Sequence, residues 1–253
     1  MATIGILGVG GLAGLILRGF SGTDHRFVLT PRGEEASVRL AAEYGHVRAA
    51  TNQEVVDRSE AVFVSLPAAT GADELARLTF RKDQPVLSAM AGTGLDRLRQ
   101  VIGPARAAVA MMPGYANACR QGPSILCPRD TFWADILSVV GPVHPFDDER
   151  QFTAAATFGA LSGAMFGWMA DLIGWFERQG IPSETARALV AGTLRGNAEV
   201  LLREPLSLAE IAKGVTTPGG ITIQLLDHLQ AQGALAAWDD GLDAVLRRIG
   251  RRG

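Results

Sequence analysis

The chain has 253 residues, of which 47% are hydrophobic and 20% are charged, and its formal net charge is −2 at pH 7. This composition is typical of a globular protein with a core, and it excludes a disordered chain. There is no basic surplus to neutralise a phosphate backbone, so we expect no nucleic-acid partner.

Short apolar runs in the first half of the sequence predict buried strands, and segments of helical periodicity lie between them. The strands are expected at residues 3–7, 26–30, 47–50, 61–66, 85–89 and 107–111. The helices are expected at 11–20, 34–44, 53–58, 72–79 and 94–102. Segments 124–127 and 143–145 are candidates for edge strands around a helix at 130–139. Strands that alternate with helices predict an α/β fold with a parallel sheet and right-handed crossovers.

After residue 148 the pattern changes, because no convincing strand follows. Helical periodicity places helices at 150–178, 183–202, 207–213, 220–231 and 233–250. We therefore divide the chain into a dinucleotide-binding α/β domain at 1–148 and an all-helical domain at 149–253.

Residues 154–176 form an apolar stretch whose single charged residue is Asp171, and the stretch is long enough to span a bilayer. Gly159, Gly163 and Gly167 recur every four residues, as they do in helices that pack closely together. The glycines dilute the hydrophobicity and basic flanks are missing, so we interpret the stretch as a buried helix and expect no membrane span.

The N-terminus has no basic targeting segment, so we expect a cytoplasmic protein.

The run Gly8-Val9-Gly10-Gly11-Leu12-Ala13 fits the pattern G-x-G-x-x-G/A directly after a predicted strand and at the start of a helix. We expect Gly8 to make the tight turn, Gly10 to let the backbone approach a diphosphate, and Ala13 to keep helix and strand close. A glycine turn without a ligand is the alternative. The context favours a dinucleotide site, in which free N–H groups and the helix dipole hold the diphosphate.

The end of the second strand indicates which dinucleotide is bound. An NAD site usually has an acidic residue there, whereas this chain has Val28-Leu29-Thr30-Pro31-Arg32-Gly33. Arg32 is placed to bind a 2′-phosphate, and the Thr30 hydroxyl can add a hydrogen bond. The sequence therefore favours NADP(H), with a surface arginine in a loop as the alternative interpretation.

Residues that the sequence lacks exclude several types of reaction. A carbonyl reductase must deliver a proton to the developing alkoxide, yet neither Tyr44 nor Tyr115 has the lysine four residues later that would form a Tyr-x-x-x-Lys pair. The two lysines, Lys82 and Lys213, are not placed to supply a helical lysine early in the second domain. No cluster has metal-ligand spacing, so we expect no metal. A protonated imine needs orientation more than a strong acid, so hydroxyls and backbone N–H groups can suffice for it.

The segment 215–222 precedes an apolar helix and contains two consecutive glycines. We expect Thr217 to cap the helix, Pro218 to occupy an early helical position, and Gly219 and Gly220 to expose backbone N–H groups. These features would form a small nest for a carboxylate. An ordinary helix cap is the alternative.

The segment VTTPGGITIQLLDHLQAQGALAAWDDGLDAVLRR resembles the C-terminal signature V-[TS]-S-P-G-G-[TA]-T of the pyrroline-5-carboxylate reductases. The start, IGILGVGGLAGLILRGF, resembles the same family's IGFIGxGNMAxAIIxG, and GIPSETARALVAGTLRGNAEVLL matches its helical portion. Shorter matches are Pro31-Arg32, Asn52-x-Glu54, Ser88-x-x-Ala91-Gly92 and Met112-Pro113. The resemblance covers nearly the whole chain in the same order.

The resemblance implies an NADPH-binding Rossmann domain, a helical dimerisation domain, active sites shared between two subunits, and reduction of a cyclic imino acid to L-proline. The assembly would be a homodimer or a larger homo-oligomer. By position, Thr222 is the family threonine beside the imine nitrogen, and Thr217, Gly219 and Gly220 match carboxylate-binding positions. Substrate contacts are also implied at Met112 and Pro113. Cofactor contacts are implied at Gly8, Val9, Gly10, Gly11, Leu12, Ala13, Thr30, Arg32, Asn52, Leu66, Pro67, Ala91 and Gly92.

The departures from the family pattern lie in the expected pocket. The family's M-P-N-T-P is Met112-Pro113-Gly114-Tyr115-Ala116 here, so two hydrogen-bonding side chains are lost and a phenol is gained. The substrate therefore stays open, and the alternatives are another small imine or carbonyl, or a non-catalytic NADP-binding regulatory protein. In the former case Tyr115, or an Asp171 whose pKa is raised by burial, would be the proton donor.

Overall fold

The structure is a computed structural model that describes residues 1–31 and 34–250, so Arg32 and Gly33 lie outside the described residues. The chain divides into two units. The first comprises Met1–Gly159 together with Leu246–Gly253, and the second comprises Ala160–Val245. The domain boundary expected after residue 148 stays a prediction, and the two units are described separately below.

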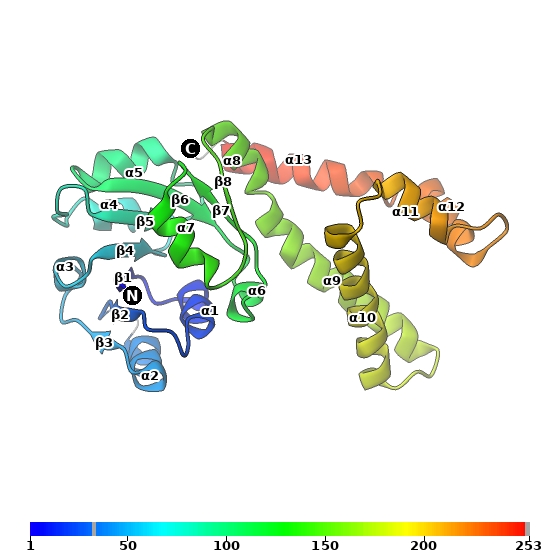
Figure 1. The fold of residues 1–253 in the computed structure, drawn as a ribbon, viewed down its shortest axis with the longest axis horizontal. Helices are drawn as coiled ribbons and strands as arrows, with labels where there is room; N and C mark the ends of the chain where they lie inside the picture. Colours follow the sequence, from blue (N-terminus) through cyan, green and yellow to red (C-terminus); the bar gives the residue numbers. More distant parts are fainter. Residues whose placement is uncertain (32–33, 251–253) are drawn as a thin grey trace. The chain divides into compact units, whose positions relative to one another are not determined.

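The first unit is built on an eight-stranded sheet with the order β3-β2-β1-β4-β5-β6-β7-β8 (Figure 1). The strands are β1 (Thr3–Leu7), β2 (Arg26–Leu29), β3 (Val47–Arg48), β4 (Ala61–Val64), β5 (Pro85–Ser88), β6 (Arg106–Met111), β7 (Ser124–Cys127) and β8 (Val143–Pro145). All neighbouring pairs are parallel except β6 and β7, which are antiparallel. The predicted α/β class, with its mainly parallel sheet followed by a helical region, is confirmed.

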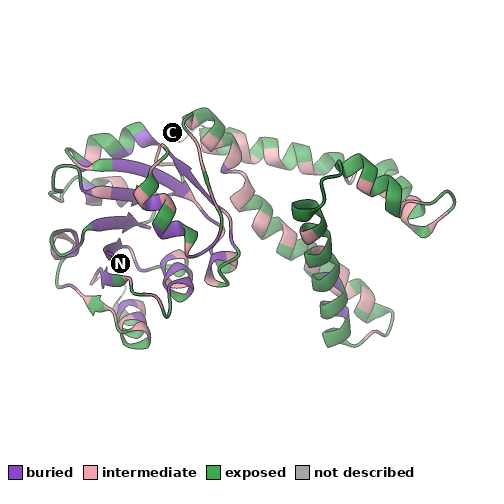
Figure 2. Ribbon diagram, in the orientation of Figure 1, coloured by how far each residue is buried: buried purple, intermediate pink, exposed green. Residues whose placement is uncertain are grey.

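Most strands are buried on both faces because helices cover each side of the sheet, whereas the edge strands β3 and β8 stay partly exposed (Figure 2). Helices α1 (Gly11–Gly19), α2 (Glu34–Tyr44) and α7 (Thr131–Ser138) contribute to the core on one face. Helices α3 (Asn52–Asp57), α4 (Gly71–Leu75) and α5 (Leu95–Ile102) contribute to the core on the other. Alternation along β1 decides which face each residue joins, since Ile4 and Ile6 enter the first core and Leu7 enters the second.

Local signals explain where the helices of this unit start. Thr51 accepts a hydrogen bond from the Glu54 N–H at the start of α3, and Asp130 accepts one from the Trp133 N–H at the start of α7. Asp148 caps α8 (Glu149–Ala155) through the Arg150 N–H. These short polar residues satisfy N–H groups that have no partner within the helix.

The structure corrects several predicted boundaries. Strands β2, β3, β4 and β5 are each one or two residues shorter than expected, and the helix predicted at 72–79 ends as α4 at Leu75. The helix predicted at 150–178 is interrupted at 156–157 into α8 and α9 (Phe158–Arg178). Helix α6 (Tyr115–Ala118) was not predicted, because four residues are too few to show an apolar period.

The second unit contains most of α9, then α10 (Ser183–Arg203), α11 (Leu208–Val215), α12 (Ile221–Ala231) and the beginning of α13 (Ala236–Gly250). Among its described residues only Ala186 and Val190 are buried (Figure 2). Glu149–Arg178 is long and apolar enough to cross a membrane by length and composition, yet little of it is buried. The expectation of a buried helix at 154–176 is therefore wrong for the single chain.

A ring cluster lies at the amino-terminal end of β2 and β3. Phe20 packs edge-on against His25 and Phe27, and the Phe27 ring centroid is 4.9 Å from that of His46. Burial is the main cause that lowers the pKa of both histidines. Within the described residues, His25 Nδ1 and His46 Nε2 are buried without a hydrogen-bond partner. The cluster therefore favours neutral imidazoles.

Candidate functional site

The glycine turn lies at the carboxyl end of β1, where the order of strands changes direction between β2 and β4. Open α/β sheets bind their ligands at such a switch point. Gly8 has a φ of +94°, and a Cβ there would lie 2.7 Å from the Ser65 carbonyl oxygen. The Ser65 hydroxyl donates to the Gly8 carbonyl at 2.7 Å, so the ends of β1 and β4 are tied together.

The next two glycines leave open space around the backbone. Within the described part of the chain, a Cβ on Gly10 or Gly11 would meet no atom within 4 Å, whereas Ala13 is fully buried against the sheet. Gly10 is the N-cap of α1 and offers no side-chain cap, so the first N–H groups of α1 lack a side-chain partner. A diphosphate can therefore approach these N–H groups at the positive end of the helix dipole. Val9 is buried and Leu12 is half-buried, so these two residues contribute backbone and packing.

The end of β2 is held by polar contacts from neighbouring elements. Thr30 is 1% exposed, and its hydroxyl donates to Asn52 Oδ1 in a very short contact. The structure thus brings Thr30 and Asn52 together, as expected for two residues of one site. The role predicted for Arg32 stays a prediction, because this residue lies outside the described part of the chain.

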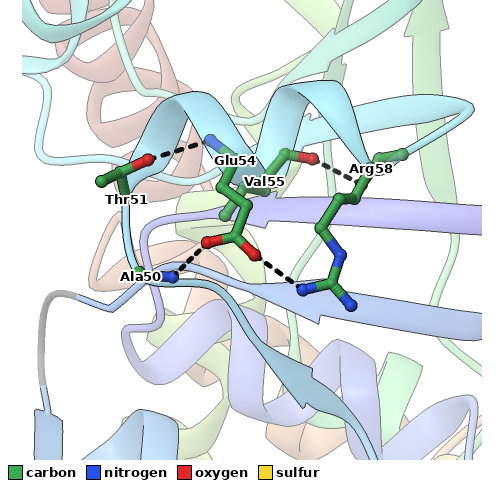
Figure 3. A network of polar contacts seen from close by, with 6 residues as sticks. Ala50, Thr51, Glu54, Val55 and Arg58 are labelled. Atoms are coloured by element: carbon green, nitrogen blue, oxygen red, sulfur yellow. Dashed lines mark hydrogen bonds and ion pairs between the residues drawn. The ribbon is translucent and has the colours of Figure 1, made fainter.

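The loop that presents Asn52 is fixed by the network in Figure 3. One Glu54 carboxylate oxygen accepts from the Ala50 N–H at 2.6 Å, and the other accepts from the Arg58 guanidinium at 2.7 Å. Thr51 Oγ1 closes the loop by accepting from the Glu54 N–H at 3.0 Å. The Ala50 N–H and then Arg58 lower the pKa of Glu54, because both stabilise the ionised carboxylate.

The remaining residues predicted to contact the cofactor line the carboxyl edge along β4 and β5. Leu66 is half-buried, Pro67 and Ala91 are exposed, and Gly92 has a φ of +75° that favours glycine. Ala91 and Gly92 border a cavity of about 490 Å³ next to β5, β6 and α8. The groups at this edge can therefore face one ligand that extends from the glycine turn toward β6.

Sequence reasoning missed the polar residues of α8 that line this cavity. Glu149 Oε1 accepts a hydrogen bond from the Leu95 N–H at 2.8 Å, so the carboxylate lies at the amino end of α5. Arg150 and Thr153 also line the cavity. The periodicity that predicted a helix from residue 150 says nothing of the cavity, because it does not show what the helix packs against.

The residues after β6 hold Tyr115 at the carboxyl edge. Met112 is buried in the core and Pro113 is half-buried, whereas Tyr115 is 65% exposed. Gly114 has a φ of +80°, and its N–H donates to Oδ1 of the fully buried Asn117 at 3.0 Å. Asn117 also donates to the Gly122 carbonyl at 2.8 Å. A buried amide that sequence reasoning missed therefore fixes the short helix that carries Tyr115.

The second unit contains the other residues predicted to contact the substrate. The Gly220 N–H donates to the Thr217 carbonyl at 2.9 Å and Gly219 has a φ of +72°, which makes residues 217–220 a turn. The N-cap of α12 is Gly220, so the expectations that Thr217 caps this helix and that Pro218 lies within it are wrong. The Gly220 N–H is engaged in the turn, and the first N–H groups of α12 remain for a carboxylate.

Thr222 and Asp171 are the other two residues considered for contact with the imine or for proton donation. Thr222 is the second residue of α12 and is half-buried. Asp171 is exposed on α9, so the burial expected for it is absent in the single chain. No group of three or more metal-ligating side chains occurs in the part of the chain that the structure describes.

Comparison with known proteins identifies relatives of both halves. Residues 149–251 match the family described as pyrroline-5-carboxylate reductase dimerisation. Residues 3–92 match the family described as NADP oxidoreductase, coenzyme F420-dependent.

Relatives and solved structures align with nearly the whole chain. The pyrroline-5-carboxylate reductase of Pseudomonas aeruginosa is 28% identical over 226 residues, which are 85% of this chain and 83% of the relative. Pyrroline-5-carboxylate reductase 2 of Bacillus subtilis is 22% identical over 91% of this chain and 87% of the relative. The crystal structure of 1-pyrroline-5-carboxylate reductase from Streptococcus pyogenes superimposes on this chain with a TM-score of 0.87 at 24% identity, covering 98% of each chain. The Plasmodium falciparum pyrroline carboxylate reductase with NADP bound has a TM-score of 0.88 at 15% identity, covering 100% of this chain and 98% of that one.

Proposed function

The chain is related over most of its length to the pyrroline-5-carboxylate reductases, and we propose from this that it uses NADPH to reduce a cyclic imino acid, pyrroline-5-carboxylate, to L-proline. The structural observation that carries the cofactor part of the proposal is the open glycine turn, where Gly10 and Gly11 leave room for a diphosphate at the start of α1.

The residues present fit a dinucleotide that runs along the carboxyl edge of the sheet. Backbone N–H groups at Gly10, Gly11 and Leu12 would hold the diphosphate, and Thr30 and Asn52 would flank the adenosine ribose. Ala91 and Gly92 would lie beside the nicotinamide. When bound, NADPH supplies a hydride from C4 of the nicotinamide.

The chain's own groups would orient the imine and exclude water. Addition of a hydride to the carbon of a protonated imine would give the secondary amine directly, so the chain would not have to deliver a further proton. The Thr222 hydroxyl would hydrogen-bond the imine nitrogen, while Thr217, Gly219 and the first N–H groups of α12 bind the carboxylate. Orientation of a protonated imine then provides the rate enhancement without a strong acid.

The experiment is NADPH oxidation by the purified protein with pyrroline-5-carboxylate and a panel of other cyclic imines, with L-proline identified by mass spectrometry. We expect turnover that is largest with pyrroline-5-carboxylate. NADPH binding without oxidation by any imine would support the non-catalytic regulatory protein instead.

The exposed Tyr115 favours a second candidate, a reductase of a different small imine or carbonyl compound. Its phenol lies at the carboxyl edge, on a helix fixed by Asn117, and a phenol can donate the proton that an alkoxide requires. Turnover of a carbonyl compound that is lost in Tyr115→Phe would support this candidate.

We further propose that the protein is a cytoplasmic homodimer whose α9 and α13 are covered by the partner. Large apolar side chains of the second unit, including Phe166, Trp168 and Trp175, are exposed in the single chain. An apolar cavity of about 390 Å³ lies between α9 and α13 and is lined by small residues such as Ala160, Ala164 and Gly241. A second copy would bury this surface without a membrane.

A further inference from the structure

Arg48 ends β3 directly beside the end of β2. The two strands are parallel and in register, with Leu29 opposite Arg48, and the Ala49 N–H donates to the Leu29 carbonyl at 3.0 Å. Carboxyl ends of parallel strands meet at one edge of the sheet, so Arg48 lies one register position before Thr30. An arginine of the edge strand therefore lies at the end of the sheet where β2 turns into α2.

The guanidinium of Arg48 is oriented by buried groups. Its Nε donates to Ser37 Oγ at 3.1 Å, and the Ser37 hydroxyl donates to the Thr30 carbonyl at 2.8 Å. Ser37 is 0% exposed and Thr30 is 1% exposed, so the two groups that orient the guanidinium lie in the protein interior. The chain Arg48–Ser37–Thr30 thus joins β3, α2 and the end of β2.

This arrangement uses one of the five N–H donors of the guanidinium. Among residues 1–31 and 35–250, no carboxylate forms an ion pair with Arg48. Arg48 is half-buried, so its side chain is not closed off from solvent. A fixed cation with spare planar donors is well suited to phosphate oxygens.

We propose that Arg48 binds the 2′-phosphate of NADPH and makes the protein selective for the phosphorylated cofactor; this rests on the proposed function. The dinucleotide fold places the adenosine ribose at the end of β2, where this chain has Thr30 and lacks an acidic residue. Ser37 and Thr30 act as positioning residues, because they hold the guanidinium toward that end of the strand.

The test measures binding of cofactor fragments by titration calorimetry. The probes are 2′,5′-ADP, which carries the 2′-phosphate, and 5′-AMP, which lacks it. Arg48→Gln should weaken 2′,5′-ADP by about ten- to hundredfold, the range of a charge-assisted hydrogen bond, and should leave 5′-AMP unchanged. Ser37→Ala keeps the charge and removes its orienting partner, so it should give a smaller loss confined to 2′,5′-ADP.

Arg26→Gln is the matched control, because Arg26 is an exposed arginine at the opposite end of β2. It removes the same net charge and should change neither affinity. Equal weakening of both fragments by Arg48→Gln, together with a lower melting temperature, would show that Arg48 only ties β3 to α2, and would overturn the proposal. Unchanged affinity for 2′,5′-ADP would overturn it as well.

The fragments separate this inference from the proposed reaction, since their binding requires no turnover. A native protein that reduces an imine with NADPH, combined with a neutral Arg48→Gln, would refute the role of Arg48 alone. A native protein that binds neither fragment would refute the role of Arg48 and the proposed cofactor together. If Arg48→Gln does not fold, Arg48→Lys and Ser37→Ala give the same contrast between the two fragments.

Discussion

Gly10→Ala should separate cofactor binding from fold stability. Gly10 has φ −101° and ψ −165°, which an alanine can adopt, and its Cβ would meet no atom of the described residues within 4 Å. The added methyl group would instead occupy the space through which a diphosphate approaches the N–H groups of α1. We therefore expect the variant to fold normally and to bind NADPH poorly.

The two magnitudes differ enough to be measured. Replacing an N-cap glycine by alanine in an allowed conformation should change the free energy of unfolding by no more than about 1 kcal/mol. A methyl group forced between backbone and diphosphate should cost about 1–3 kcal/mol of binding free energy, by analogy with overpacking. That cost corresponds to a rise of roughly 5- to 150-fold in the NADPH Kd.

The assay is NADPH fluorescence titration with thermal unfolding of the same samples. Gly14→Ala is the control, because Gly14 also lies in α1 but its Cβ would make an ordinary 3.7 Å contact with Leu40 of α2, so NADPH affinity should not change. Gly8→Ala is the contrasting variant, since a φ of +94° and the nearby Ser65 carbonyl should destabilise the fold by roughly 1–3 kcal/mol or more. A folded Gly10→Ala protein that binds NADPH like the native chain would refute the reasoning.

Thr222→Val should lower turnover about ten- to thousandfold while NADPH affinity stays constant, because it removes one oriented donor and keeps the side-chain shape. A larger loss in Tyr115→Phe than in Thr222→Val, measured as kcat, would contradict this and favour the second candidate substrate class. Gly163→Leu should weaken the dimer by overpacking, and light scattering that reports the same mass for both proteins would oppose it. Acid should destabilise the first unit, because burial lowers the pKa of His25 and His46 and the unfolded chain therefore binds more protons than the folded one. The contribution of these histidines to stability should be full above pH 6.5, the ordinary histidine pKa, and should fall below it. His46→Leu should flatten that dependence in urea titrations at several pH values, and an unchanged slope would count against it.

Much of the first unit was predictable because its signals are local. Apolar runs indicated the buried strands, and the glycines at 8, 10 and 11 indicated the turn into α1 from their number and spacing alone. The antiparallel placement of β7 was not predictable, because four apolar residues have no signal for strand direction. Helix α6 was missed for a related reason, since a buried side-chain amide from Asn117 holds it and no periodic pattern does.

The candidate site likewise contains features that the sequence predicted correctly and one that it did not. Gly8 and Ala13 were assigned correctly to a turn and a close packing contact, because backbone geometry within a few residues requires them. The cap expected at Thr217 was wrong, because Gly219 takes a positive φ and Gly220 closes the turn before the helix begins.

What the sequence determined by itself was therefore the α/β order of elements, the glycine turn and the helical second half, since each follows from residues adjacent in the chain. Only the tertiary structure placed Arg48 beside Ser37 and Thr30, and Glu149 at the amino end of α5. These residues are separated along the chain and come together because the pairing register of parallel strands and the packing of helices against them set their positions. No local pattern in a single sequence contains that register.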